Sequence, residues 1–225
     1  MNKLFLDIET IPCQRDGALD EIRATIAPPG TIKKAESIAD WMVLNADTAA
    51  EEQYRKTSFD GAKGEICCIG WAVNDEPVQT TYRDLHQSES VLLMDFFAAQ
   101  GVDKSWQIIG HNVISFDIRF LYNRCVINSV RPSFNLRQDE RYNGGKVYDT
   151  MLAWAGWGNR ISLKNLSAAL GVKVKSAGLD GSKVWDYVQA GRIKEVADYC
   201  AEDVEATREI YRRMTFNADF GADNE

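Results

Sequence analysis

Four carboxylates at three separate places in the chain have the side-chain types and the spacing of a metal site. Asp7 and Glu9 lie two residues apart in the apolar run LFLDIET, and on a β-strand both side chains would leave the same face. Asp117 stands where the loop GHNVISFD meets a helical pattern. Tyr199 and Asp203 lie four residues apart, which puts both on one face of a helix. A buried carboxylate is costly unless it is paired or bound to a metal, so a cluster of these groups would require cations.

Each of these groups also has an ordinary structural explanation. The two acids on the strand would fit a face that water covers, although Phe5 shares that face. Asp117 would fit the N-cap of a helix, and the last pair would fit a plain amphipathic helix. Together, however, four oxygen ligands from three segments favour Mg²⁺ or Mn²⁺ over zinc. Four carboxylates around two such ions form the clamp expected for in-line displacement at a phosphodiester.

Hydrophobic periodicity predicts the elements that would bring these residues together. Strands are expected at 3–9, 65–73, 77–82, 106–112 and 146–149, with the second and third forming a hairpin. Helices are expected at 88–100, 117–127, 149–156, 162–171 and 192–214, with Ser88 and Ser162 as N-caps. The alternation of strands and helices indicates an α/β or α+β sheet with helical cover.

Residues 14–60 separate the first two predicted strands by far more than an ordinary connection. The pattern predicts two short helices in this insertion, at about 33–45 and 47–56. The segment is expected either to have a function of its own or to cover one face of the sheet. A cover that limits access to single strands is one hypothesis for its role.

Composition places limits on the partners and the compartment. The 225 residues are 45% hydrophobic, which is enough for one sizeable core, and the net charge is -7. This charge argues against a generally basic coat for nucleic acid, although bound cations could still hold phosphates. The five cysteines include no C-x-x-C spacing, which favours reduced thiols in a cytoplasm. No apolar run is long enough to cross a membrane, and an acid in MNKLFLD comes too early for a signal peptide.

Four stretches of the chain resemble motifs of one enzyme superfamily. LDIET (6–10), GHNVISFD (110–117) and YCAEDVEAT (199–207) are similar to the three motifs of the DEDD 3'→5' exonucleases. The resemblance implies their ribonuclease H-like fold, an α/β fold in which helices flank a central mixed β-sheet. SLKNLSAALG (162–171) resembles a stretch that these enzymes carry between motifs two and three. Asp198 stands where the His variant of the third motif needs histidine, so the chain resembles the Tyr variant. GAKGEICCIGWAV and the insertion resemble predicted exonucleases related to the proofreading domain of family-B DNA polymerases.

The resemblance implies a role for each member of the cluster. Asp7 would bridge two divalent cations, Mg²⁺ or Mn²⁺. Glu9 and Asp203 would complete the first metal site, and Asp117 would hold the second. Tyr199 would orient the attacking water, because a phenol with a reference pKa of about 10 is a poor base near neutral pH. The products would be 5'-mononucleotides.

Five residues near the motifs are candidates for contact with substrate. They are Thr10, Ile11, Asn112, Phe116 and Arg119. Thr10 and Ile11 would meet the 3'-terminal nucleotide through backbone and an apolar wedge, and Asn112 would support the backbone or touch that nucleotide. Phe116 would fit the core as well as a stacking platform. Arg119 begins a stretch, 119–146, in which six basic residues are interleaved with Tyr122, Phe134 and Tyr142. This stretch would fit either a strand-binding flank or a solvated surface.

These features predict one exonuclease domain over residues 1–215, with an acidic tail at 216–225. The expected substrate is the 3' end of DNA, with a preference for single strands, and a partner in replication or repair is left open. The same chemistry on RNA or short oligoribonucleotides is the nearest alternative. A nucleic-acid-binding accessory module without turnover is the alternative of another class. His111 is expected to be a loop or core histidine, and Asp149 a helix N-cap.

Overall fold

The computed structural model describes residues 2–101, 105–136, 145–173 and 179–217 of the chain. Its centre is a five-stranded sheet with the order β3-β2-β1-β4-β5. The strands are β1 (Asn2–Ile11), β2 (Glu65–Val73), β3 (Gln79–Tyr82), β4 (Trp106–Gly110) and β5 (Val147–Asp149). β1 runs antiparallel to β2 and parallel to β4, β2 and β3 form the predicted hairpin, and β5 is parallel to β4. The predicted α/β class with a mixed central sheet is confirmed.

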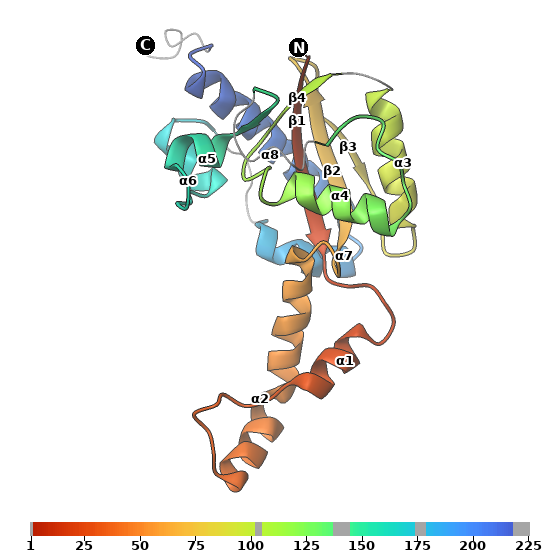
Figure 1. Ribbon diagram of the computed structural model, residues 1–225, viewed down its shortest axis with the longest axis vertical. Coiled ribbons are helices and arrows are strands. Elements are labelled where there is room, and N and C mark those ends of the chain that lie inside the picture. The colour runs from red at the N-terminus through yellow and green to blue at the C-terminus, as the bar shows by residue number, and fades with distance from the viewer. Residues whose placement is uncertain (1, 102–104, 137–144, 174–178, 218–225) are drawn as a thin grey trace.

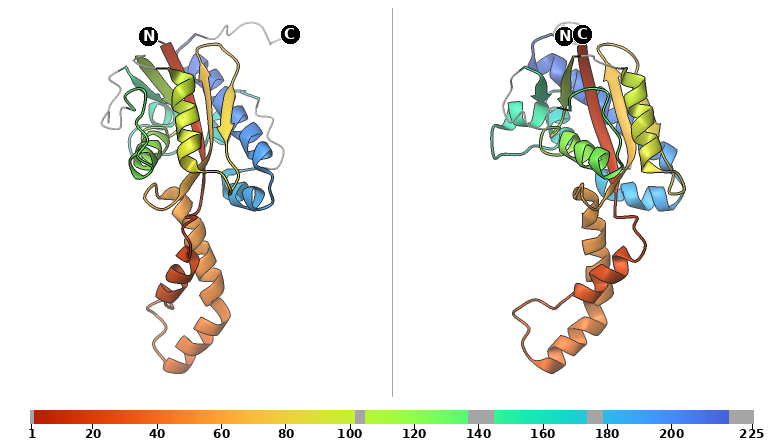
Figure 2. Two further views of the ribbon diagram at one scale, coloured as in Figure 1. Left: turned by 90° about the vertical axis from the view of Figure 1, so that its right-hand side faces the viewer. Right: turned by 45° about the vertical axis from the view of Figure 1, so that its right-hand side comes forward.

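Helices cover both faces of this sheet. The helices that follow β3 in the chain are α3 (Glu89–Gln100), α4 (Asp117–Ile127), α5 (Thr150–Ala155), α6 (Leu163–Ala169), α7 (Val184–Gln189) and α8 (Ile193–Met214), with a short 3-10 turn η2 (Gly181–Lys183) before α7. The predicted caps are present, since the hydroxyls of Ser88 and Ser162 accept hydrogen bonds from backbone N–H groups of α3 and α6. α3 and α4 lie on one side of the sheet and α8 on the other (Figure 2). None of the helices in the described part of the chain has the length and apolar character needed to cross a membrane.

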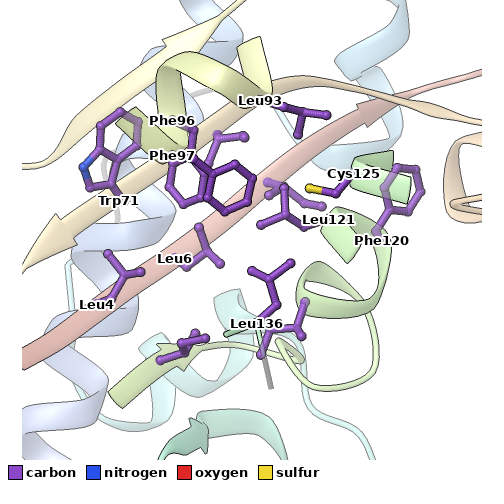
Figure 3. Close-up of a cluster of buried hydrophobic side chains, with 14 of the residues drawn as sticks. Leu4, Leu6, Trp71, Leu93, Phe96, Phe97, Phe120, Leu121, Cys125 and Leu136 are labelled. Carbon is purple, nitrogen blue, oxygen red and sulfur yellow. The ribbon is translucent and has the colours of Figure 1, made fainter. Parts of the chain in front are cut away.

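Alternation along β1 divides the sheet into two unlike faces. Leu4, Leu6 and Ile8 belong to the larger hydrophobic cluster, which the side chains of α3 and α4 complete (Figure 3). Phe5 leaves the opposite face and packs edge-on against Tyr211 of α8, with ring centroids 5.7 Å apart. The next side chains on that second face are the acids of the first motif. β1 therefore carries Asp7 and Glu9 on the face of the sheet that α8 covers.

The inserted segment forms an arm and not a cover (Figure 1). It contains α1 (Ala18–Thr25), α2 (Ala35–Lys56) and the 3-10 turn η1 (Thr57–Phe59). The two predicted short helices are wrong, because α2 is a single helix of 22 residues and α1 was not predicted. Asn45 does not break α2, since its amide donates to the carbonyl of Trp41 one turn earlier, at 3.0 Å. The suggestion that the segment covers a sheet face is also wrong, since α1 and α2 project beyond the end of β1.

Candidate active site

The two acids of β1 sit beside an irregularity in the sheet. The pairing of β1 with β2 shifts register between Glu9 and Thr10, where Cys67 is the extra residue on β2. The Cys67 thiol donates to the Glu9 carbonyl at 3.4 Å. Such a bulge increases the local twist and re-aims neighbouring side chains. Glu9 is buried and Asp7 is partly exposed, so the surface reaches this part of β1 at Asp7.

Asp117 reaches the same strand from the other side of the sheet. The parallel pairing of β1 with β4 covers only Asn2 to Phe5. Beyond that point the backbone N–H of Ile8 donates to Asp117 Oδ1 at 3.0 Å. Asp117 is the first residue of α4 and is buried, while Phe116 occupies the N-cap position. Asp117 is therefore not the N-cap of α4, and the N-cap explanation of this acid is wrong.

α8 supplies the remaining members of the cluster. Asp203 and Tyr199 are both partly buried on the side of this helix that meets β1 and β2. The Tyr199 hydroxyl forms a hydrogen bond with the Asp203 carboxylate, which lowers the pKa of that acid. α8 comes close to the sheet at Gly70, the partner of Asp7 in the ladder, where a Cβ would lie 2.8 Å from Cys200 Sγ. Five predicted residues from three segments thus meet at one place.

Burial raises the pKa of every carboxyl in the cluster, and repulsion from other members of the cluster adds to this for Asp7 and Glu9. Burial is the largest cause for Asp7, followed by repulsion from Asp117, Glu9 and Asp203, and it raises the Asp7 pKa well above its usual value. Burial and then the charges of Asp203 and Asp117 have the same effect on Glu9. Burial raises the pKa of Asp117 to about 7 and that of Asp203 to about 6. Acids that repel one another in this way are stabilised by an added cation.

The donor set fits divalent metal ions. Ligand atoms of Asp7, Glu9 and Cys200 all lie within 4.8 Å of one another. Among the described residues, no lysine or arginine forms an ion pair with any carboxylate of the cluster, so no salt bridge in that part of the chain neutralises this charge. Carboxylate oxygens are the ligands that Mg²⁺ and Mn²⁺ prefer. Cys200 adds a thiol, whose Sγ lies 3.5 Å from Asp7 Oδ2 and which lowers the pKa of that acid through a hydrogen bond.

A buried acid holds the loop that leads to Asp117. The Asp149 carboxylate accepts from the backbone N–H groups of Asn112 and Ile114, at 3.0 and 3.1 Å. It also caps α5 as predicted, since it accepts from Met151 N and Leu152 N. Asn112 has the left-handed φ of 63°, so Asp149 fixes an unfavourable turn in this loop. The role predicted for Asn112 in supporting the backbone or touching a nucleotide stays a prediction.

His111 is a structural residue, as predicted. Its Nδ1 lies 2.9 Å from the hydroxyl of Thr150, and its Nε2 lies 2.9 Å from the carbonyl of Ile161. Burial lowers its pKa, so the neutral ring is favoured. Both ring nitrogens are therefore committed to holding the loops together.

The other predicted contact residues lie in different environments. The Thr10 hydroxyl donates to the carbonyl of Ser58 in η1, at 2.7 Å. Ile11 is fully buried among Cys67, Cys68 and residues of α7, so its side chain fills the core and is not a wedge for a nucleotide. Phe116 is half-buried at the edge of the larger cluster, and Arg119 is exposed on α4.

The predicted basic flank contains fewer free cations than the sequence suggested. Arg124 is buried in an ion pair with Glu89, with Nη2 and Oε2 2.6 Å apart, and cannot reach a phosphate. Phe134 is buried in the core and is not available to stack on bases. Arg137 and Arg141 lie outside the described residues. Arg131 is exposed and Lys146 is half-buried.

Two features beside the cluster were not predicted from the sequence. The thiol of Cys200, a buried residue of α8, touches Asp7, and nothing in the sequence indicated this contact. The exposed Phe59 of η1 lies 6.5 Å from Phe116, measured between ring centroids. A long insertion that returns to the sheet just after the first motif was the only signal that could have indicated this contact.

Comparisons with known proteins identify the family and a related fold. Residues 64–223 match the family model described as a predicted 3'-5' exonuclease related to the exonuclease domain of PolB. The fold is similar to the family B DNA polymerase from the hyperthermophilic archaeon Pyrobaculum calidifontis, with a TM-score of 0.57 and 14% sequence identity. That likeness covers 96% of this chain and 24% of the polymerase, so the chain spans about a quarter of its length. A search of curated proteins found no match. The chain belongs to the family of predicted 3'-5' exonucleases related to the exonuclease domain of PolB.

Proposed function

We propose that this exonuclease releases 5'-mononucleotides from the 3' ends of DNA, with a preference for single strands. The observation that carries the proposal is the meeting of Asp7, Glu9, Asp117, Tyr199 and Asp203 at one end of the central strand. The family match begins after the first motif, at residue 64. The roles of Asp7 and Glu9 therefore rest on the geometry and on the resemblance of LDIET to the first motif.

The four carboxylates would hold two divalent cations, Mg²⁺ or Mn²⁺. Asp7, Glu9 and Asp203 would bind one, and Asp7 with Asp117 would bind the other. Bound divalent cations supply the positive charge that activates an attacking water and stabilises the leaving oxygen of a phosphodiester. Asp117 also ties α4 to β1 through the Ile8 N–H, so the ligands from two elements keep a fixed separation.

Tyr199 would position the water and would not remove its proton. Burial, followed by the charges of Asp203 and Glu9, raises the pKa of the Tyr199 hydroxyl far above neutral. The phenol is therefore protonated at neutral pH and acts as a hydrogen-bond donor. Its bond to Asp203 fixes the direction of the ring, which leaves orientation as its contribution to the rate.

The test compares Asp7→Ala and Asp203→Ala with the unchanged protein. The substrates are 3'- and 5'-labelled single-stranded DNA, duplex DNA and RNA of one sequence, with Mg²⁺, Mn²⁺ or a chelator. Both variants should release no mononucleotide and should melt at a temperature near that of the unchanged protein or above it. Asp198→Ala is the matched control, because this exposed acid lies on the same helix and, among the described residues, pairs with Lys194 alone. Digestion by Asp7→Ala at the unchanged rate would refute the mechanism.

The same experiment separates the alternatives. Faster digestion of RNA than of DNA would favour an exoribonuclease. Binding of Mg²⁺ by calorimetry without any release of nucleotide would favour an accessory module. Products that begin at the 5' end would contradict the proposed polarity.

A further inference from the structure

The inserted segment places an exposed aromatic ring beside the second motif. Phe59 ends η1 and is 68% exposed. Its ring lies 6.5 Å from that of Phe116, and the ring of Phe116 lies 5.4 Å from that of Phe120. Phe120 is buried, so the three rings form a row that runs from the surface into the core. Only the outermost ring of the row, that of Phe59, is exposed, so it is the ring that a ligand can reach.

The residues next to Phe59 and Phe116 in the sequence are hydrogen-bonded to β1, the strand that carries Asp7 and Glu9. Ser58, which precedes Phe59, accepts the hydrogen bond from Thr10, the residue after Glu9. Asp117, which follows Phe116, accepts the hydrogen bond from Ile8. Phe59 and Phe116 are therefore each adjacent in the sequence to a residue that is hydrogen-bonded to residues 8–10 of β1.

η1 is held rigidly in this place. Gly64 packs so tightly that a Cβ there would lie 2.5 Å from the Thr57 carbonyl and 2.9 Å from the Ile11 carbonyl. The Thr57 hydroxyl also accepts from the backbone N–H of Cys13, at 2.9 Å. On the other side, a Cβ on Gly61 would lie 2.9 Å from the Asn123 amide of α4. Phe59 is thus an exposed ring on a fixed base, which reduces the entropy lost when a ligand stacks on it.

The surroundings of Phe59 suit a polyanion. Lys56 is exposed just before η1 and Arg119 is exposed on α4, whereas Lys63 after η1 pairs with Asp60 at 3.7 Å. Cations that follow the backbone together with aromatic rings that stack on bases are the usual means of binding a single strand without sequence preference. A partner protein that binds at this surface would not require the rings to be connected to the strand that carries Asp7 and Glu9.

We propose that Phe59 and Phe116 form a stacking platform for the bases of a single strand whose 3' end lies at the carboxylate cluster. This inference rests on the proposed function and adds a substrate contact from the inserted segment. Because every base has an aromatic face, the platform accepts any sequence, and because paired bases cannot stack on it, it favours single strands.

The first test is Phe59→Ala with Phe216→Ala as the matched control. Phe216 is a phenylalanine that is 83% exposed, and it follows α8, whose C-terminal end lies at the opposite end of the molecule from α2 (Figure 1). Fluorescence anisotropy of labelled single-stranded DNA in a chelator measures binding without hydrolysis. Phe59→Ala should weaken binding about tenfold and Phe59→Trp should restore it, whereas Phe216→Ala should have no effect. With Mg²⁺ present, Phe59→Ala should raise KM and leave kcat nearly unchanged.

The second test identifies the base that stacks. Oligonucleotides with an abasic site at each of the last six positions are bound to the unchanged protein and to Phe59→Ala. An abasic site at the stacked position should weaken binding by the unchanged protein. It should also remove the difference in affinity between the unchanged protein and Phe59→Ala. Equal binding by both proteins to every oligonucleotide would overturn the proposal, and so would a penalty that is the same at all positions.

The binding assay also separates this proposal from the proposed function. Binding that depends on Phe59 in a protein that releases no nucleotide would refute the nuclease and leave the platform intact. Normal digestion and binding by Phe59→Ala would refute the platform and leave the nuclease intact, and would point to a protein partner for this ring.

Discussion

At the scale of single residues, the site is a group of acids that the fold holds together against their own repulsion. Burial raises the pKa of Asp7 most, and repulsion from Asp117, Glu9 and Asp203 raises it further. The Cys200 thiol, the Ile8 N–H and the Tyr199 hydroxyl are compensating donors to acids of the cluster. These donors hold the acids in position without neutralising them, which is the arrangement needed by a site that binds cations reversibly.

We therefore predict that the metal-free protein loses stability as the pH rises from about 4 to about 7. Asp117 has its pKa raised from 3.8 to about 7, so in this range the folded state holds a proton that the unfolded chain has released. The resulting stability is complete below about pH 4 and disappears as the pH passes the folded pKa. Urea unfolding in a chelator, at about pH 5 to about pH 7.5, measures the slope. Asp117→Asn should flatten it, and an identical slope in both proteins would contradict the assignment.

Replacement of Tyr199 by phenylalanine should lower the rate and leave metal binding in place. The hydroxyl donates to Asp203 and is not among the groups placed around the cations, so its loss removes only the orientation of the water. We expect kcat to fall at least about tenfold, toward the range in which positioned proton-bearing groups act. Single-turnover kinetics and Mg²⁺ calorimetry on the same preparation check both parts. A variant with normal kcat would remove Tyr199 from the mechanism.

At the scale of elements, buried polar contacts fix α4 and the loops around the site. Glu89 at the start of α3 accepts from Arg124 of α4, from the Ile66 N–H of β2 and from the Asn128 amide, at distances between 2.6 and 3.0 Å. These contacts join two helices and a strand on the face of the sheet opposite α8. Since Asp117 begins α4, they also contribute to the position of a proposed metal ligand.

Arg124→Met should destabilise the protein by about 3–5 kcal/mol, because it leaves the carboxylate of Glu89 buried without its cation. Arg124→Met combined with Glu89→Leu should recover part of this loss, since no unpaired charge then stays buried. Urea midpoints measure both variants. Arg192→Ala is the control, because its pair with Glu195 is exposed and its loss should hardly move the midpoint. A small effect of the buried variant would show that water reaches Glu89.

The elements also show what the sequence could and could not predict. The strand 65–73 and the helix 117–127 were predicted with the observed bounds, because apolar periodicity and local turn residues determine them. The single helix α2 was missed because Asn45 and Asp47 resemble a break, whereas Asn45 bonds within the helix and Asp47 pairs with Arg23 of α1. Contacts between distant segments, such as Glu89 with Arg124, leave no local pattern. The carboxylates were predicted because their types and motifs are unusual, and Cys200 was not because buried cysteine is common.

At the scale of the whole molecule, the arm is an appendage whose base alone borders the site. α2 is anchored at that base by the ion pair of Arg55 with Asp186, at 2.7 Å, and by the ring contact of Tyr54 with Trp185. Farther out, α1 packs along α2, and both project away from the sheet (Figure 2). Val43 on this outer part is 85% exposed. The hypothesis that the whole insertion limits access to single strands therefore reduces to a hypothesis about η1.

Removal of the outer arm should leave nuclease activity intact. Residues 27–44 are replaced by a short Gly-Ser linker, which can close the gap because Arg23 and Asp47 already form an ion pair. We expect the melting temperature and the ratio of digestion of single-stranded to duplex ends to stay as in the unchanged chain, since the removed segment adds little to the core. Phe59→Ala in the shortened protein should still weaken binding of single strands. A ratio that changes on removal of the outer arm alone, with Phe59 in place, would instead assign strand selection to the part of the insertion that lies far from the carboxylates.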